Sequence, residues 1–214
     1  MLKEYIGLLA AEIVLCTFML LFWFWKGHLI TLIIAIGMFI FIVTTLYFFR
    51  DPERSKPLQK DIIIAPADGR ITCIRQHQEN AFCHTTVTTV SIFLRLWDVH
   101  VNRIPVTGKV EFCQYRKGKF HLAMSDKASK NNEQMQIGLV NEHGRFLIRQ
   151  VAGMIARRIV CRVKEGDTVL QGERFGLIKF GSLVELSIPQ KYRLMVHENQ
   201  NVKAGETIIG ILER

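Results

Sequence analysis

Residues 6–25 read IGLLAAEIVLCTFMLLFWFW, an apolar stretch whose single ionisable residue is Glu12. As an α-helix these twenty residues would extend roughly 30 Å, the thickness of the hydrocarbon core of a bilayer. A second stretch, residues 29–49, carries no charge and is also long enough to span. Only residues 26–28 separate the two stretches. The sequence therefore predicts a membrane-anchoring helical hairpin within residues 1–49.

A cleavable signal peptide is the alternative interpretation of the first stretch. The stretch is too long for one, no small-residue cleavage site follows it, and the second apolar stretch comes immediately after. Glu12 would cost about 3 kcal/mol at the centre of a bilayer, so we expect it to pack against the second helix or to be protonated.

Basic residues predict the orientation of the hairpin. Its turn holds only Lys26, whereas five basic residues flank its outer ends: Lys3, Arg50, Arg54, Lys56 and Lys60. Both ends are therefore expected to face the cytoplasm, which places the rest of the chain on the cytoplasmic side of the cell membrane. The five cysteines form no CxxC pair, which fits a reducing compartment and argues against a zinc ribbon or a disulfide framework.

The remainder of the chain has the pattern of a β-rich domain. Residues 50–60 are polar, contain two prolines and read as a juxtamembrane linker. In residues 61–214, short β-branched runs alternate with Gly, Pro and polar turns, although 123–136 could be a loop or a short helix. The similar motifs VKEGDTV (163–169) and VKAGETI (202–208) form an internal repeat that is typical of barrel-sandwich turns. The predicted fold is mainly β and barrel-sandwich-like with some α, preceded by the transmembrane hairpin.

The net charge of +9 has two interpretations. One is an ordinary solvated basic surface, and the other is attraction to an anionic membrane surface. No basic helix or array of basic and aromatic residues is present, so a nucleic-acid partner is not predicted.

The dipeptide Gly181-Ser182 is the main candidate for chemistry. The chain has no GxSxG, HExxH, P-loop or GxGxxG motif, and its histidines form no metal-ligand pair at helical spacing. Glycine permits strained backbone and leaves its carbonyl open to approach, and the next hydroxyl could attack that carbonyl in an N-to-O acyl shift. A plain β-turn is the competing interpretation of the same two residues.

Five sequence blocks lie in order over about residues 65–185 and read APADGRI, WDVHVNRIPVTGKV, NNEQM, QVAGMIARRIVC and GERFGLIKFGSLVEL. These blocks make the chain similar to the short form of the phosphatidylserine decarboxylase proenzyme family. The resemblance implies that Ser182 attacks Gly181, that the chain cleaves itself between 181 and 182, and that Ser182 becomes a covalent pyruvoyl group. A Schiff base between this group and the substrate amine would then convert phosphatidylserine to phosphatidylethanolamine and CO2 without a metal. The two cleaved chains are expected to stay associated, and a homo-oligomer is left open.

Two further catalytic residues are implied by the resemblance. Asp68 matches the motif aspartate that supports maturation, and a carboxylate bonded to a histidine would raise the basicity of that histidine. A turn residue before Gly69 is the plainer interpretation of Asp68. His100 matches the first histidine of the HxxHxP motif of longer members and is our candidate base, with His121 and His143 in reserve.

The chain departs from that motif at its second histidine, which falls on Arg103. Arg103 could instead hold the substrate phosphate or carboxylate, and Arg157 and Arg158 could meet the headgroup phosphate. Each of these arginines could equally be an ordinary surface charge.

Two other functions compete with the membrane-lipid decarboxylase. A tethered lipoyl-like carrier or adaptor would fit the barrel-sandwich turns, but its candidate lysine, Lys179, falls inside a predicted strand. A pyruvoyl enzyme acting on a soluble amino acid would have no use for a membrane anchor.

Overall fold

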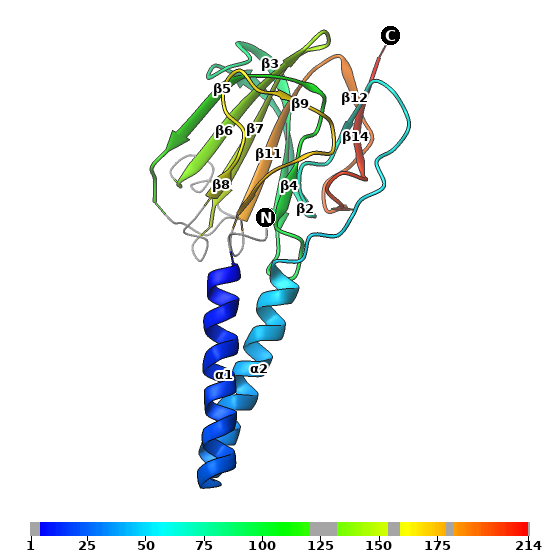
Figure 1. Ribbon diagram of the computed structural model, residues 1–214. Coiled ribbons are helices and arrows are strands. Elements are labelled where there is room, and N and C mark those ends of the chain that lie inside the picture. The colour runs from blue at the N-terminus through cyan, green and yellow to red at the C-terminus, as the bar shows by residue number, and fades with distance from the viewer. Residues whose placement is uncertain (1–4, 120–131, 154–158, 179–181, 214) are drawn as a thin grey trace. The chain divides into compact units, whose positions relative to one another are not determined.

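The computed structural model describes residues 5–119, 132–153, 159–178 and 182–213 (Figure 1). The chain divides into two compact units, Met1–Asp51 and Pro52–Arg214. The first holds two helices and the second is built from strands, so the predicted fold class is confirmed.

The first unit is a helical hairpin formed by α1 (Ile6–Lys26) and α2 (Leu29–Phe48). Gly27 ends α1 in the left-handed conformation, with φ at 67°, and donates its N–H to the carbonyl of Trp23 at 2.7 Å. This conformation favours glycine and reverses the chain within two residues. Both helices are long and apolar enough to cross a membrane by length and composition.

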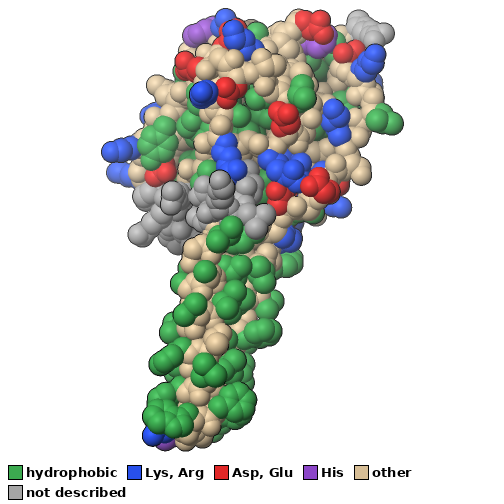
Figure 2. Space-filling model, in the orientation of Figure 1, with side chains coloured by type: hydrophobic (Ala, Val, Ile, Leu, Met, Phe, Trp, Pro, Cys, Tyr) green, Lys and Arg blue, Asp and Glu red, His purple; other side chains and the backbone are tan. Residues whose placement is uncertain are grey.

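Glu12 packs against α2, which was one of the two arrangements expected from the sequence. Its side chain is buried, and its Oε1 accepts a hydrogen bond from the Thr45 hydroxyl at 3.2 Å. Hydrophobic side chains cover most of the visible face of the hairpin, whereas charges of both signs are spread over the β domain (Figure 2).

The described residues of the second unit form one large and two small antiparallel sheets. The eight-stranded sheet has the order β13-β2-β3-β11-β7-β6-β5-β9, and the three-stranded sheets have the orders β4-β10-β8 and β1-β14-β12. The strand bounds are β1 (Ile62–Ile64), β2 (Gly69–Glu79), β3 (Thr85–Leu94), β4 (Val101–Arg103), β5 (Gly108–Arg116), β6 (Gln134–Asn141), β7 (Gly144–Ala152), β8 (Ile159–Cys161), β9 (Thr168–Val169), β10 (Arg174–Ile178), β11 (Ser182–Pro189), β12 (Tyr192–Leu194), β13 (Asn201–Val202) and β14 (Ile208–Leu212).

One apolar core connects the three sheets. Side chains alternate between the two faces of a strand, and on β11 the residues Val184, Leu186 and Ile188 belong to this core. Phe175 of β10 and Ile209 of β14 enter the same core from the small sheets. Alternation therefore assigns the first residue of β11 to the same inward face.

Gly69 explains why the PADG motif ends in glycine. Its φ is +154°, and a Cβ atom there would lie 2.2 Å from the carbonyl oxygen of Phe93. Any side chain would push β2 away from β3, so glycine keeps the first residues of β2 against the end of β3. Asp68 is thereby held directly beside this strand pair.

Two sequence expectations differ in detail from the structure. Residues 134–136, expected within a loop or short helix, begin strand β6, because they pair with residues 114–116 of β5 and 149–151 of β7. The rest of the segment, up to residue 131, lies outside the described residues. The linker 50–60 contains no helix or strand, and the boundary between the two units falls at Asp51.

A buried ionic cluster occupies the outward face of β11. Glu185 is 2% exposed and binds Arg149 at 2.8 Å, Arg75 at 3.3 Å and the Ser91 hydroxyl at 3.3 Å. The cluster ties the central strand β11 to both of its neighbours, β7 and β3. Because a buried charge is costly without its partner, the integrity of this cluster should matter to stability.

We expect Glu185→Gln to lower the free energy of unfolding by about 3 kcal/mol, because it leaves Arg149, whose side chain is only 18% exposed, without its carboxylate. Chemical denaturation of the full chain in detergent measures the change. Glu53→Gln is the matched control, since Glu53 pairs with Arg174 while 88% exposed and should leave the denaturation midpoint unchanged. Equal midpoints for both variants would show that the buried cluster does not stabilise the fold.

Candidate active site

Ser182 is the first residue of β11 and lies between two neighbouring strands. Its Cα is paired with Leu94 of β3 and with Ala152 of β7. The side chain is fully buried, and its Oγ has no hydrogen-bond partner among the described residues. A buried hydroxyl left without a partner costs about 1–3 kcal/mol, so a serine here calls for a functional explanation.

His100 lies beside the end of β10, the strand that precedes Ser182 in the chain. It immediately precedes β4, its side chain is 3% exposed, and its carbonyl accepts a hydrogen bond from the Ile178 N–H at 3.4 Å. Ile178 is the last described residue before 182. The predicted base and the predicted nucleophile therefore belong to neighbouring strand ends of one domain.

Two buried amide side chains that we did not predict, those of Asn102 and Gln150, lie on the inward side of the strands near Ser182. Asn102 follows His100 by two residues, and its Oδ1 accepts a hydrogen bond from Gln150 Nε2 at 2.7 Å. Gln150 precedes Ala152 by two residues on β7, so it is a diagonal neighbour of Ser182 at about 7–8 Å between Cα atoms. Both side chains are 0% exposed, and Asn102 Nδ2 and Gln150 Oε1 have no partner among the described residues.

The sequence contained a signal for both amides. His100 and Asn102 alternate with Val99 and Val101, which is the period of a strand, and Gln150 interrupts the apolar run of β7. A polar residue at an inward position of an apolar strand is unusual, because its burial is unfavourable without a partner.

Asp68 has different partners from the histidine that we expected. Its Oδ2 accepts a hydrogen bond from Arg54 at 2.7 Å and its Oδ1 accepts one from the Ala204 N–H at 2.8 Å. Burial raises the pKa of Asp68 despite both bonds, and the nearby Asp98 carboxylate adds to the increase. Asp98 lies two residues before His100, so Asp68 is close to the segment that carries the candidate base.

Arg103 forms part of the attachment of the linker to the β domain. Its Nη1 donates to the Gly172 carbonyl at 3.1 Å and its Nη2 donates to the Pro52 carbonyl at 3.0 Å. It also lines a pocket of about 360 Å³ together with Arg54, Lys56 and Arg174. Arg157, Arg158, His121, Lys179 and Gly181 lie outside the described residues.

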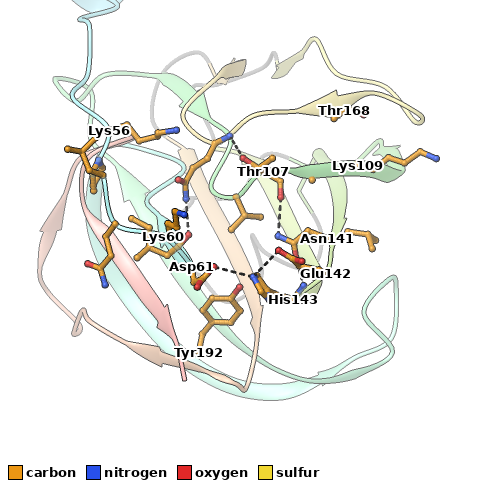
Figure 3. Close-up of a pocket in the computed structure, with 18 residues that line it drawn as sticks. Lys56, Lys60, Asp61, Thr107, Lys109, Asn141, Glu142, His143, Thr168 and Tyr192 are labelled. Carbon is orange, nitrogen blue, oxygen red and sulfur yellow. Dashed lines mark hydrogen bonds and ion pairs between the residues drawn. The ribbon is translucent and has the colours of Figure 1, made fainter. Parts of the chain in front are cut away.

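The reserve histidine His143 lies at the opposite end of the sheet. It precedes the first residue of β7, whereas Ser182 pairs with the last, and this length of strand corresponds to about 25–30 Å. Its Nε2 lies 3.3 Å from Asp61 Oδ1 and 3.5 Å from Glu142 Oε1, in a pocket of about 730 Å³ (Figure 3). His143 is therefore too far away to accept a proton from Ser182.

Three thiols of this domain, Cys83, Cys113 and Cys161, are poor alternatives to Ser182 as nucleophiles. Burial raises the pKa of Cys83 and of Cys113 to about 12, and it also raises the pKa of Cys161. A thiol attacks as its thiolate, which is scarce at neutral pH at such values. Within the described parts of the chain, no group of His, Cys, Asp or Glu side chains is arranged to hold a metal ion.

Comparison with known proteins identifies the family. The family model for phosphatidylserine decarboxylase matches residues 41–210. The chain belongs to the phosphatidylserine decarboxylase family. A phosphatidylserine decarboxylase proenzyme of Chlorobium phaeobacteroides is 48% identical over 176 residues, which cover 82% of each chain. One of Salinibacter ruber is 43% identical over 191 residues, which cover 88% of this chain and 82% of the relative. The family predicted from the five sequence blocks is thus confirmed.

Proposed function

We propose that this chain is a self-processing, membrane-bound decarboxylase that converts phosphatidylserine to phosphatidylethanolamine and CO2. The observation that carries the proposal is the buried Ser182 hydroxyl, which has no partner among the described residues and stands at the family's cleavage motif. The names of the relatives support it, because they are phosphatidylserine decarboxylase proenzymes.

Self-processing begins with the attack of Ser182 Oγ on the carbonyl carbon of Gly181. The C–N bond breaks, an ester forms, and the nitrogen becomes the free amine of residue 182. A base then removes the Cα proton of residue 182, and the carboxylate of Gly181 leaves. The resulting dehydroalanine tautomerises and takes up water, and ammonia departs to leave the pyruvoyl group. His100 is the base that we propose, because it borders the same strand end.

The site fits a group formed in place from Ser182. The side chain is enclosed, its hydroxyl is not engaged by any described residue, and two amides with unsatisfied polar atoms lie on the same wall. The pyruvoyl group supplies a ketone that binds the substrate amine and accepts the electrons released as CO2 leaves. Asn102 Nδ2 would donate to the substrate carboxylate, and Arg103, Arg157 and Arg158 are proposed for the headgroup phosphate.

The sheet order suits a cleaved enzyme whose two chains stay together. Cleavage before residue 182 would release a fragment that starts with β11, the strand between β3 and β7. Its ladders run from Ser182 to Pro189 against β3 and from Ser182 to Ser187 against β7. Many backbone hydrogen bonds would have to break at once to separate the fragments, so we expect them to remain associated.

The apolar hairpin suits a substrate that is itself a lipid. Two helices of membrane length would hold the β domain at a bilayer, and the basic residues around the hairpin would place that domain on the cytoplasmic side of the cell membrane. The net charge of +9 would add attraction to an anionic surface. A soluble amino acid would require none of these features.

Intact-mass measurement of the purified full chain tests the proposal. We expect residues 1–181 and 182–214 as two species in place of one of 24.7 kDa, with the smaller species resistant to Edman degradation. The same preparation should release CO2 from phosphatidylserine. An active preparation consisting only of the uncut chain would contradict the proposed processing.

A further inference from the structure

The turn between β3 and β4 exposes two adjacent apolar side chains. Leu96 is 47% exposed and Trp97 is 58% exposed. No other two sequence neighbours among the described residues of the β domain are both large exposed hydrophobics. Single exposed apolar residues are common on soluble surfaces, but an adjacent tryptophan and leucine are less so.

An ionic clamp fixes the shape of this turn. Asp98 accepts hydrogen bonds from the Arg95 backbone N–H at 2.9 Å, from its Nε at 3.0 Å and from its Nη2 at 3.2 Å. The Arg95 guanidinium also lies 5.5 Å from the centre of the Trp97 ring. A turn that is already ordered loses little conformational freedom when it docks on another surface.

The turn stands at the same end of the large sheet as Ser182. Leu94, directly before the turn, is paired with Ser182, and His100 directly follows Val99 at the other side of the turn. The two exposed side chains are therefore held at the rim of the proposed active site.

We propose that Leu96 and Trp97 form a lipid-inserting tip, which docks the β domain on the bilayer interface and brings the site around Ser182 to a phospholipid headgroup. The inference rests on the proposed function, since it gives that function its access to a lipid substrate. It also assigns a role to two residues that the chemistry itself does not require.

The chemistry of the tip favours a bilayer over a protein partner. Tryptophan, with its apolar ring and polar N–H, concentrates at membrane–water boundaries, and arginine can keep its charge in water above buried apolar atoms. Two residues are far fewer than the roughly 20 that each side of a stable protein interface contributes. The chain also carries its own membrane-length helices, so a bilayer is always near.

Fluorescence of the full chain can test the tip directly, because the protein has only three tryptophans. In a Trp23→Phe, Trp25→Phe variant, Trp97 is the only one left. We expect its emission to shift to the blue in phosphatidylcholine–phosphatidylserine vesicles. Lipids brominated near the headgroup end of the acyl chain should quench it more strongly than lipids brominated near the chain end.

The matched control moves the probe to the other end of the same strand. Asn80 is exposed in the turn before β3, so Asn80→Trp in a chain with all three native tryptophans replaced by phenylalanine should be quenched little. Equal quenching at positions 80 and 97, or none at 97, would overturn the inference. Fluorescence quenching does not require catalysis, so its result tests the lipid-inserting tip independently of the proposed function.

Measurement of decarboxylation provides a second test of the lipid-inserting tip. Replacing Leu96 and Trp97 by serine should lower decarboxylation of vesicle-bound phosphatidylserine by about ten-fold, the factor that burial of one large apolar side chain supports. Self-cleavage and turnover of dispersed short-chain phosphatidylserine should be unchanged. Unchanged turnover on vesicles would overturn the inference, whereas failure of the native chain on every substrate would instead refute the proposed function.

Discussion

Replacing Ser182 with alanine should leave a single uncut chain of 24.7 kDa and abolish decarboxylation. The substitution removes only Oγ, an atom that is fully buried and has no hydrogen-bond partner among the described residues. Alanine should therefore not cost stability, and the fold should persist while the chemistry is lost. Gel mobility, intact mass and release of CO2 from phosphatidylserine measure the three parts of this expectation.

Ser187→Ala is the matched control on the same strand. Ser187 is also buried, but it faces outward and lies 2.7 Å from the Thr89 hydroxyl, within hydrogen-bonding distance. Its loss should reduce stability by about 1 kcal/mol and leave cleavage intact. Ser182→Thr, which keeps a hydroxyl, should restore some cleavage at a lower rate. Normal cleavage in Ser182→Ala would exclude Ser182 as the nucleophile, and an uncut Ser187→Ala chain would show that cleavage responds to any disturbance of β11.

The hairpin and most of the strands could be predicted because they depend on local pattern. A charge-free run of membrane length and a two-residue period are both visible in a single sequence. Strand β6 was partly missed because two of its first three residues, Gln134 and Gln136, are polar although they pair with β7. Their burial arises from neighbours in the fold, which no local pattern reveals.

The candidate site was predictable only where a motif identified it. Gly181-Ser182 and His100 could be named from sequence blocks, but the Asn102–Gln150 hydrogen bond joins residues 48 positions apart. Asp68 shows the same limit, because its partners Arg54 and Ala204 come from the linker and from the second of the two similar turn motifs. Such pairs are set by sheet topology, so they become visible only when the strands have been placed.

Replacing His100 with glutamine should slow self-cleavage by about 100-fold or more, the usual contribution of a positioned general base. Glutamine keeps polarity and approximate size but cannot accept a proton as imidazole does. The measurement is the half-time for the appearance of fragment 182–214 after a pulse of synthesis. The pH profile of cleavage should also change in the variant, because general-base catalysis makes the rate depend on the protonation state of the base.

A second histidine, His143, provides the control for the His100 variant. His143 lies at the far end of β7, and His143→Gln should cleave at the native rate and keep the native pH profile. A merely structural role for His100 would slow cleavage without removing its pH dependence, so the profile separates a base from a packing residue. Native cleavage in His100→Gln would exclude this imidazole as the base. The remaining candidates for the base would then be His121, the other reserve histidine, and Asp68, whose pKa is raised by burial, which makes its carboxylate more basic than that of an ordinary aspartate.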